Sequence, residues 1–157
     1  MIKHVGYDIV FREIPDETTL AINLTLCPNR CRGCHSAYLR EDRGEILSEE
    51  VLDNMVSDYV GEVTCICFMG GDNDPNEVAR LARHLHERYH GEFLTAWYSG
   101  KSDFPDGFDA GAFDFVKIGP YIPERGPLNK PTTNQRLYRM HADGRREDIT
   151  FRLQQRP

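Results

Sequence analysis

Residues 63–72 read Val63-Thr64-Cys65-Ile66-Cys67-Phe68-Met69-Gly70-Gly71-Asp72. The first seven are almost all apolar, which is typical of a strand buried on both faces of a parallel sheet. Helix start signals follow the glycines, with Asp74 as N-cap, Pro75 at the first position and Glu77 where a capping box requires it. The stretch therefore predicts a strand, a tight turn and a helix in succession, which is the repeating unit of α/β proteins.

Similar units lie on both sides of this stretch. Strand-like composition occurs at residues 5–11, 18–26, 93–98 and 113–118, and helical periodicity at residues 48–60 and 75–90. Alternating β and α elements predict a parallel sheet with flanking helices and right-handed crossovers. About four such units are too few for a closed eight-stranded barrel. We therefore expect an α/β fold of one domain, residues 1–157, built as an open partial (β/α) barrel.

The tail from about residue 120 follows a different pattern from the rest of the chain. Four prolines between residues 120 and 131 interrupt regular structure there. Residues 135–140 and 148–153 are expected to pair as a hairpin around Ala142-Asp143-Gly144. The tail is therefore predicted to be irregular, with this hairpin near its end.

The charge and composition exclude several classes of protein. The chain carries 25 acidic and 19 basic residues, and its net charge of −6 argues against general nucleic-acid binding. No apolar run reaches the ~18 residues that would indicate a membrane span. Residues 1–4 lack the charged-then-apolar pattern of a signal peptide. We expect a cytoplasmic protein that binds neither nucleic acid nor membrane.

Three of the five cysteines are concentrated in one short segment. It reads Cys27-Pro28-Asn29-Arg30-Cys31-Arg32-Gly33-Cys34-His35. An odd number of clustered cysteines argues against a disulfide framework and favours metal-binding thiolates. Three thiolates can each hold one iron of a 4Fe–4S cluster and leave the fourth iron open to a ligand.

Zinc held by the three cysteines and His35 is the alternative metal site. However, Cys34 and His35 are adjacent, and zinc ligands that share one tetrahedral ion are usually separated by two or more residues. Taken alone, the residues favour an iron–sulfur cluster and leave zinc open.

The Cys-x3-Cys-x2-Cys spacing at the end of the first βα strand resembles the signature of the radical S-adenosylmethionine (SAM) superfamily. In that superfamily the open iron chelates the amino and carboxylate groups of the methionine part of SAM. Reductive cleavage then yields methionine and a 5′-deoxyadenosyl radical. Gly70-Gly71-Asp72 resembles the superfamily's Gly-Gly-Glu turn after the second strand, with a carboxylate one methylene shorter.

Within the superfamily, the chain resembles the family of activating proteins of anaerobic ribonucleoside-triphosphate reductases. The resemblance runs from about Ile14 onward and rests on the segments just quoted together with three others. These are Trp97-Tyr98-Ser99-Gly100, Val116-Lys117-Ile118-Gly119-Pro120-Tyr121 and Thr132-Thr133-Asn134-Gln135-Arg136. It implies an oxidoreductase that generates a glycyl radical on a large reductase subunit, with electrons from a donor such as flavodoxin.

The same resemblance implies a role for each matching residue. Cys27, Cys31 and Cys34 are the expected cluster ligands. Gly33, Cys34 and His35 are expected to form the loop beside SAM, and Gly71 and Asp72 to meet its methionine amino group. The alternative interpretation of His35 is a surface loop residue.

Several other residues have two open interpretations. Trp97, Tyr98 and Lys117 are further candidates near the strand ends. The alternative is core packing for the two aromatic residues and a surface cation for Lys117. Cys65 and Cys67 share one face of their strand, and we favour buried core residues over an auxiliary metal or redox pair.

Two other functions are compatible with the same motifs. One is a related radical SAM enzyme, either an activase of another glycyl radical enzyme or one acting on a small molecule. The other belongs to a different class, a non-catalytic zinc-binding interaction module.

Overall fold

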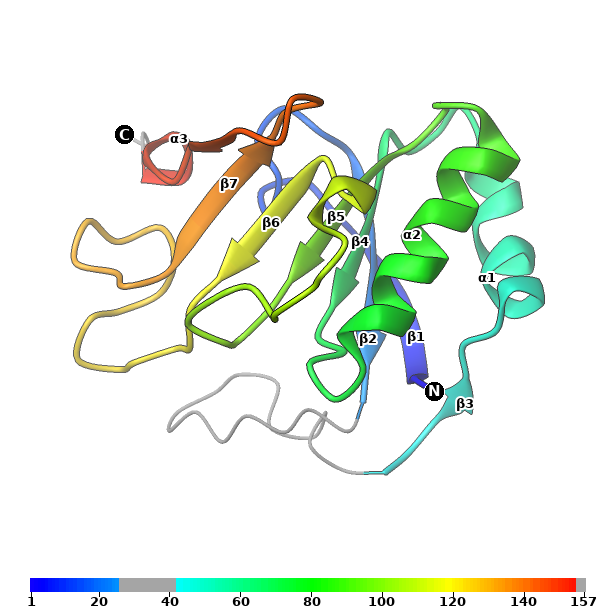
Figure 1. The fold of residues 1–157 in the computed structure, drawn as a ribbon, viewed down its shortest axis with the longest axis horizontal. Helices are drawn as coiled ribbons and strands as arrows, with labels where there is room; N and C mark the ends of the chain where they lie inside the picture. Colours follow the sequence, from blue (N-terminus) through cyan, green and yellow to red (C-terminus); the bar gives the residue numbers. More distant parts are fainter. Residues whose placement is uncertain (26–41, 155–157) are drawn as a thin grey trace.

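The structure is a computed structural model that describes residues 1–25 and 42–154 (Figure 1). Within these residues the chain forms an α/β fold around one eight-stranded mixed sheet of order β3-β1-β2-β4-β5-β6-β7-β8. The strands are β1 (Lys3–Val10), β2 (Thr19–Leu24), β3 (Glu45–Ile46), β4 (Cys65–Met69), β5 (Leu94–Tyr98), β6 (Phe115–Ile118), β7 (Arg136–Met140) and β8 (Arg146–Asp148). The helices are α1 (Glu49–Val56), α2 (Pro75–Tyr89) and α3 (Phe151–Gln154), with 3₁₀ turns η2 (Ser57–Tyr59) and η3 (Ala110–Ala112).

The centre of the sheet confirms the predicted parallel arrangement. Strands β2, β4, β5 and β6 pair in parallel, and each crossover carries a helix or a 3₁₀ turn on the way to the next strand. The outer strands β1, β3, β7 and β8 pair antiparallel, so the sheet is mixed rather than wholly parallel. Its edge strands β3 and β8 do not pair with each other in the described part of the chain, and no closed barrel forms there.

Local sequence signals account for where the helices begin. The Ser48 hydroxyl accepts a 3.1 Å hydrogen bond from the Val51 amide and so caps α1. At the start of α2, Asp74 caps the Glu77 amide as predicted, and Pro75 occupies the first turn. The ends differ slightly from expectation. α1 ends at Val56 and continues as η2, and α2 ends with His90 in the left-handed conformation.

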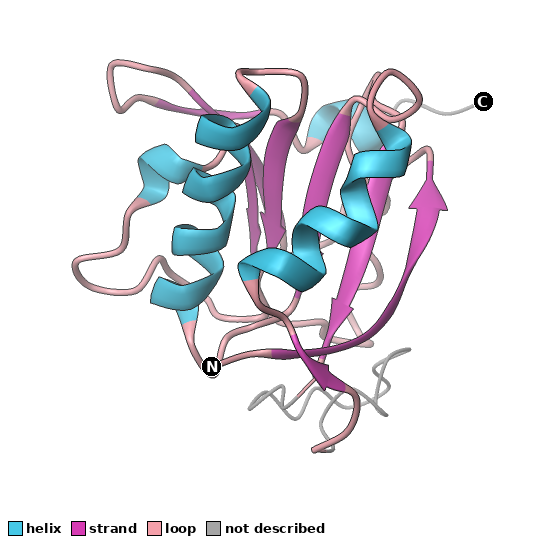
Figure 2. Cartoon of the chain, turned by 90° about the vertical axis from the view of Figure 1, so that its right-hand side faces the viewer, coloured by secondary structure: helices cyan, strands magenta, loops and turns pink. Residues whose placement is uncertain are grey.

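The two faces of the sheet have separate apolar clusters, and Figure 2 shows the face that the helices cover. Helices α1 and α2 lie side by side on one face, where Asp53 of α1 accepts a 2.9 Å hydrogen bond from His84 of α2. Their apolar stripes pack on the strand residues that point toward them. The opposite face is covered by a smaller cluster: Ile14, Cys65, Cys67, Ala96, Phe115, Leu137 and Ile149. The strands are therefore buried from both sides, as the apolar run of β4 indicated.

The tail is partly as predicted. Strands β7 and β8 form an antiparallel hairpin around residues 141–145, with Tyr138 opposite Asp148. The second strand was predicted over residues 148–153, and this is wrong. It spans Arg146–Asp148, and Phe151–Gln154 form the short helix α3 instead. The Thr150 hydroxyl and amide both bond Asp148 Oδ1, a local side-chain turn that ends the strand.

No helix in residues 1–25 and 42–154 is long and apolar enough to cross a membrane.

Candidate functional site

The four parallel strands end at one edge of the sheet. Asn23 of β2 is in register with Met69 of β4, and Met69 with Tyr98 of β5. Strand β4 runs directly into Gly70-Gly71-Asp72, and β5 into Ser99-Gly100-Lys101. Ligands of open α/β sheets bind outside the carboxyl ends of the strands. This edge is therefore the candidate site.

The structure places only part of the predicted site. The expected cluster ligands and the loop residues beside SAM lie outside the described residues: Cys27, Cys31, Gly33, Cys34 and His35. Gly71 and Asp72 are described, and both are buried at the carboxyl end of β4.

The two glycines form a turn that other side chains would not fit. Both have positive φ angles, +104° at Gly70 and +87° at Gly71, where residues with a Cβ are strained. A Cβ on Gly71 would lie 2.5 Å from Val78 Cγ2 and 2.9 Å from Leu24 Cδ1. The turn is thus packed between the end of β2 and the first turn of α2.

Hydrogen bonds from both sides orient this turn. The Trp97 indole donates to the Gly70 carbonyl at 2.6 Å, and the Gly70 amide donates to the Tyr98 carbonyl at 3.0 Å. The Asp74 amide donates to the Gly71 carbonyl at 3.0 Å. Trp97 is fully buried, so its predicted alternative role in core packing is confirmed, and it also fixes the Gly70 peptide.

Asp72 is only 8% exposed and is bonded to the neighbouring strand end. The Ser99 hydroxyl donates to its Oδ1 at 2.6 Å, and the Gly100 amide donates to its Oδ2 at 2.8 Å. These two bonds hold the carboxylate in one orientation between β4 and β5. Neither bond follows from the local sequence pattern, because Ser99 and Gly100 are 27 and 28 positions away from Asp72 in the chain.

Lys117, in β6, connects the carboxyl ends of β5 and β6. Its ammonium donates to the carbonyls of Ser99 and Gly119 at 3.1 and 3.0 Å, and it lies 5.6 Å from the centre of the Tyr98 ring. The side chain is 9% exposed. The interpretation of Lys117 as a surface cation is therefore wrong. Because it bonds carbonyls of two successive strand ends, it stabilises the edge on which the site lies.

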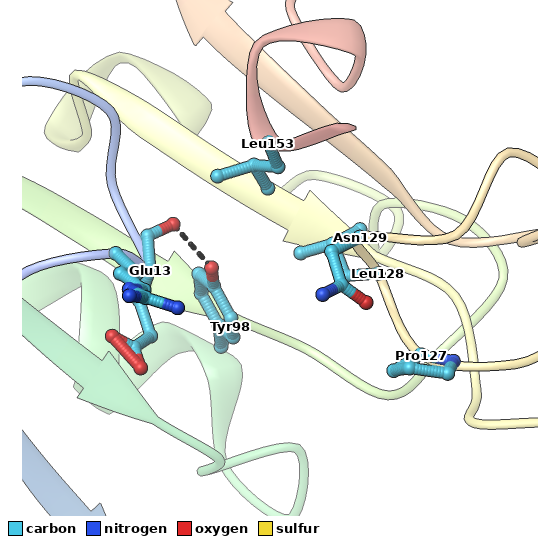
Figure 3. A pocket seen from close by; sticks show the side chains of 7 residues that line it. Glu13, Tyr98, Pro127, Leu128, Asn129 and Leu153 are labelled. Atoms are coloured by element: carbon cyan, nitrogen blue, oxygen red, sulfur yellow. Dashed lines mark hydrogen bonds between the residues drawn. The ribbon is translucent and has the colours of Figure 1, made fainter. Parts of the chain in front are cut away.

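A pocket of about 330 Å³ lies beside Tyr98 (Figure 3). Tyr98 and Leu153, which line it, pack against the smaller apolar cluster on the sheet face opposite α1 and α2. It is lined by Arg12, Glu13, Tyr98, Pro127, Leu128, Asn129 and Leu153. Tyr98 donates its hydroxyl hydrogen bond to the Glu13 carbonyl oxygen, as Figure 3 shows. Burial, followed by the nearby Cys67, raises the pKa of Tyr98 well above its ordinary value. The phenol therefore stays neutral and acts as a fixed wall of the pocket.

Cys65 and Cys67 are buried thiols on the same face of β4, and neither forms a disulfide. Burial raises the pKa of both, with Cys67 adding to the effect on Cys65 and Glu13 to the effect on Cys67. A thiol that stays protonated is a poor metal ligand. No group of three His, Cys, Asp or Glu residues in the described ranges is arranged to hold a metal ion. The expectation that the two are core residues is confirmed.

Comparison with protein-family models, curated proteins and solved structures gave no match to this chain.

The described residues fit part of the predicted ligand. The buried Asp72 carboxylate and the peptide carbonyls of the glycine turn all accept hydrogen bonds, and they lie together at one strand end. Such a surface suits the ammonium group of an amino acid, which donates three hydrogen bonds and accepts none. For the cluster, the expected donor set is the three cysteines at positions 27, 31 and 34, which lie outside the described residues; thiolates are the usual ligands of iron–sulfur clusters.

Proposed function

We propose that this chain is a radical SAM enzyme that generates a glycyl radical on the large subunit of an anaerobic ribonucleoside-triphosphate reductase. Cys27, Cys31 and Cys34 would hold a 4Fe–4S cluster. Gly71 and Asp72 would receive the ammonium group of SAM. When bound, the cluster would supply the electron that cleaves the sulfonium of SAM, and flavodoxin or a similar donor would supply that electron to the cluster.

One contact between two strand ends carries the proposal. A Cβ on Gly70 would lie 3.4 Å from the Leu24 carbonyl oxygen, so the glycine turn adjoins the last residue of β2. In the sequence, Cys27 follows Leu24 by three residues. The segment that carries the proposed cluster ligands is therefore connected to a strand end that adjoins the turn proposed to bind SAM.

The chain's own residues would orient SAM and leave the chemistry to the bound groups. The bonds from Ser99 and Gly100 hold the Asp72 carboxylate, and the Trp97 indole holds the Gly70 peptide. Because these bonds already fix the turn, binding of SAM would cost little further conformational entropy in the protein.

We propose that the mixed sheet is the partial-barrel form of the superfamily and that its open side admits a loop of the partner protein. The edge strands β3 and β8 do not pair with each other within the described residues, so the sheet is not closed there.

The test is anaerobic reconstitution with iron and sulfide, followed by reduction, addition of SAM and an assay for 5′-deoxyadenosine. The proposal expects 5′-deoxyadenosine only when the cluster is present, and a glycyl EPR signal when the large reductase subunit is added. Cleavage of SAM without a glycyl signal would point to another glycyl radical enzyme or a small-molecule substrate. Stoichiometric zinc in place of iron, with no SAM cleavage, would support the interaction module instead.

A further inference from the structure

The start of strand β1 lies between the two ends of the segment that carries the clustered cysteines. In the sheet, β1 has β2 on one side and β3 on the other. His4 is in register with both Leu24 of β2 and Glu45 of β3. The described residues stop at Thr25 and resume at Asp42. Both ends of the segment are therefore attached to the same few residues of β1.

Thr25 makes the central contacts of this attachment. Its amide donates to the Lys3 carbonyl at 2.9 Å, and its hydroxyl donates to the Arg43 carbonyl at 2.8 Å. The second bond joins the two ends of the segment directly. Thr25 is fully buried, so water does not compete for these bonds.

Further contacts hold the returning end against β1. The Lys3 ammonium pairs with Asp42 at 2.6 Å, and the Leu47 amide donates to the Ile2 carbonyl at 2.9 Å. Gly44 has φ +89°, and a Cβ there would collide with the His4 carbonyl oxygen. The close approach of the two backbones at Gly44 shows that this end is packed tightly on β1.

We infer that Thr25 is a positioning residue for metal binding, because its hydroxyl holds the two ends of the cysteine-bearing segment together before any metal arrives. The inference rests on the proposed function, in which Cys27, Cys31 and Cys34 are the ligands. Bringing the two ends of a chain segment together costs entropy. A fold that has already closed the segment leaves less of that cost to metal binding.

The experiment compares iron retention in two pairs of proteins that differ by one hydroxyl. Thr25→Val keeps the shape of threonine and removes the donor, and it is compared with the wild type. Thr25→Ala is compared with Thr25→Ser, since both lack the methyl group and only the serine keeps the hydroxyl. The readouts are release of iron to a chelator from the reconstituted protein and the EPR spectrum of the reduced cluster.

Loss of one hydrogen bond predicts roughly threefold to tenfold faster iron release in the valine and alanine variants, with serine close to the wild type. Thr64→Val is the matched control. The Thr64 hydroxyl donates to the Thr18 carbonyl at the amino end of β4, the opposite end of the sheet. Thermal unfolding of the metal-free proteins shows that each variant is folded, and the alanine–serine pair decides the matter if valine is not accommodated.

Equal iron release in the variants with and without the hydroxyl would overturn the role of Thr25 and leave the proposed function standing. A wild-type protein that takes up no cluster would overturn the proposed function itself, and this inference with it.

Discussion

The hydroxyl of Ser99 donates a 2.6 Å hydrogen bond to Oδ1 of Asp72, and this bond joins the carboxyl ends of two neighbouring parallel strands. The Gly100 amide bonds the other carboxylate oxygen at 2.8 Å. The residue proposed to receive the SAM ammonium group is thus held by β5 as well as by its own strand. Because of these bonds, the effect of the orientation of the Asp72 carboxylate on SAM binding can be tested separately from the effect of its charge.

Replacing Ser99 by alanine should weaken SAM binding although Ser99 is not proposed to touch SAM. The variant removes the buried hydrogen bond from Ser99 to Asp72 Oδ1, and we expect the free energy of unfolding to fall by about 1–2 kcal/mol. Urea unfolding measures the stability, and calorimetric titration of the reconstituted protein measures the SAM affinity. Ser102→Ala, an exposed serine of the same loop, is the control and should change neither. Unchanged SAM affinity in folded Ser99→Ala would show that Asp72 does not need this bond.

Replacing Gly71 by alanine should destabilise the fold more than the same change at Gly61. The two glycines have similar φ angles, +87° and +83°, so the backbone strain of an alanine is matched at about 1–2 kcal/mol. Only Gly71 has neighbours in the way, with Val78 Cγ2 at 2.5 Å, whereas a Cβ on Gly61 meets nothing within 4 Å. We expect the collision to cost a further 1–3 kcal/mol, roughly, in urea unfolding. Equal losses at the two positions would contradict the packing of the turn.

The proposed cluster ligands can be separated from the buried thiols by matched substitutions. Cys31→Ala should lose most of the bound iron and all SAM cleavage, because a cubane cluster with two protein ligands is poorly held. Cys67→Ala should keep iron and cleavage but lose about 1–2 kcal/mol of stability, since it leaves a small cavity in the core. Iron analysis and thermal unfolding of both variants give the answer. Full iron content in Cys31→Ala would remove that residue from the ligand set.

Protonation of His4 should destabilise the start of β1 in mild acid. Burial lowers the pKa of His4 below its ordinary value of 6.5, although the neighbouring Glu45 partly opposes the shift. The neutral ring accepts a 3.2 Å hydrogen bond from the Gly6 amide at Nδ1, and protonation removes that acceptor. The unfolded chain therefore binds the proton more readily, and the contribution of His4 to stability is lost as the pH falls below about 6.5.

The measurement is urea unfolding of the wild type and of His4→Asn at about pH 7.5 and about pH 5.5. Asparagine offers an acceptor near the position of Nδ1 but does not titrate in this range. The wild type should lose more stability between the two conditions than the variant does. Parallel losses would mean that other groups, such as the carboxylates, account for the acid sensitivity.

Features encoded by neighbouring residues were predicted closely. The start of α2 follows from Asp74, Pro75 and Glu77, which act within one helical turn, and the burial of β4 follows from its continuous apolar run. The hairpin after β7 follows from turn residues close in sequence. The short helix α3 was missed because its four residues carry too little periodicity to distinguish a helix from a strand.

The sequence by itself determined the alternation of strands and helices, the start of α2, and the cysteine spacing that predicts a cluster. Each depends on residue types at short separations, where propensity and periodicity act. Only the tertiary structure decided that β1 and β7 pair in antiparallel orientation with the outer strands of the parallel core. It also decided that Lys117 is buried and that Ser99 and Thr25 form hydrogen bonds with Asp72 and Arg43, respectively. These contacts join residues far apart in the chain, and they form because folding brings strand ends together where water no longer competes for their polar groups.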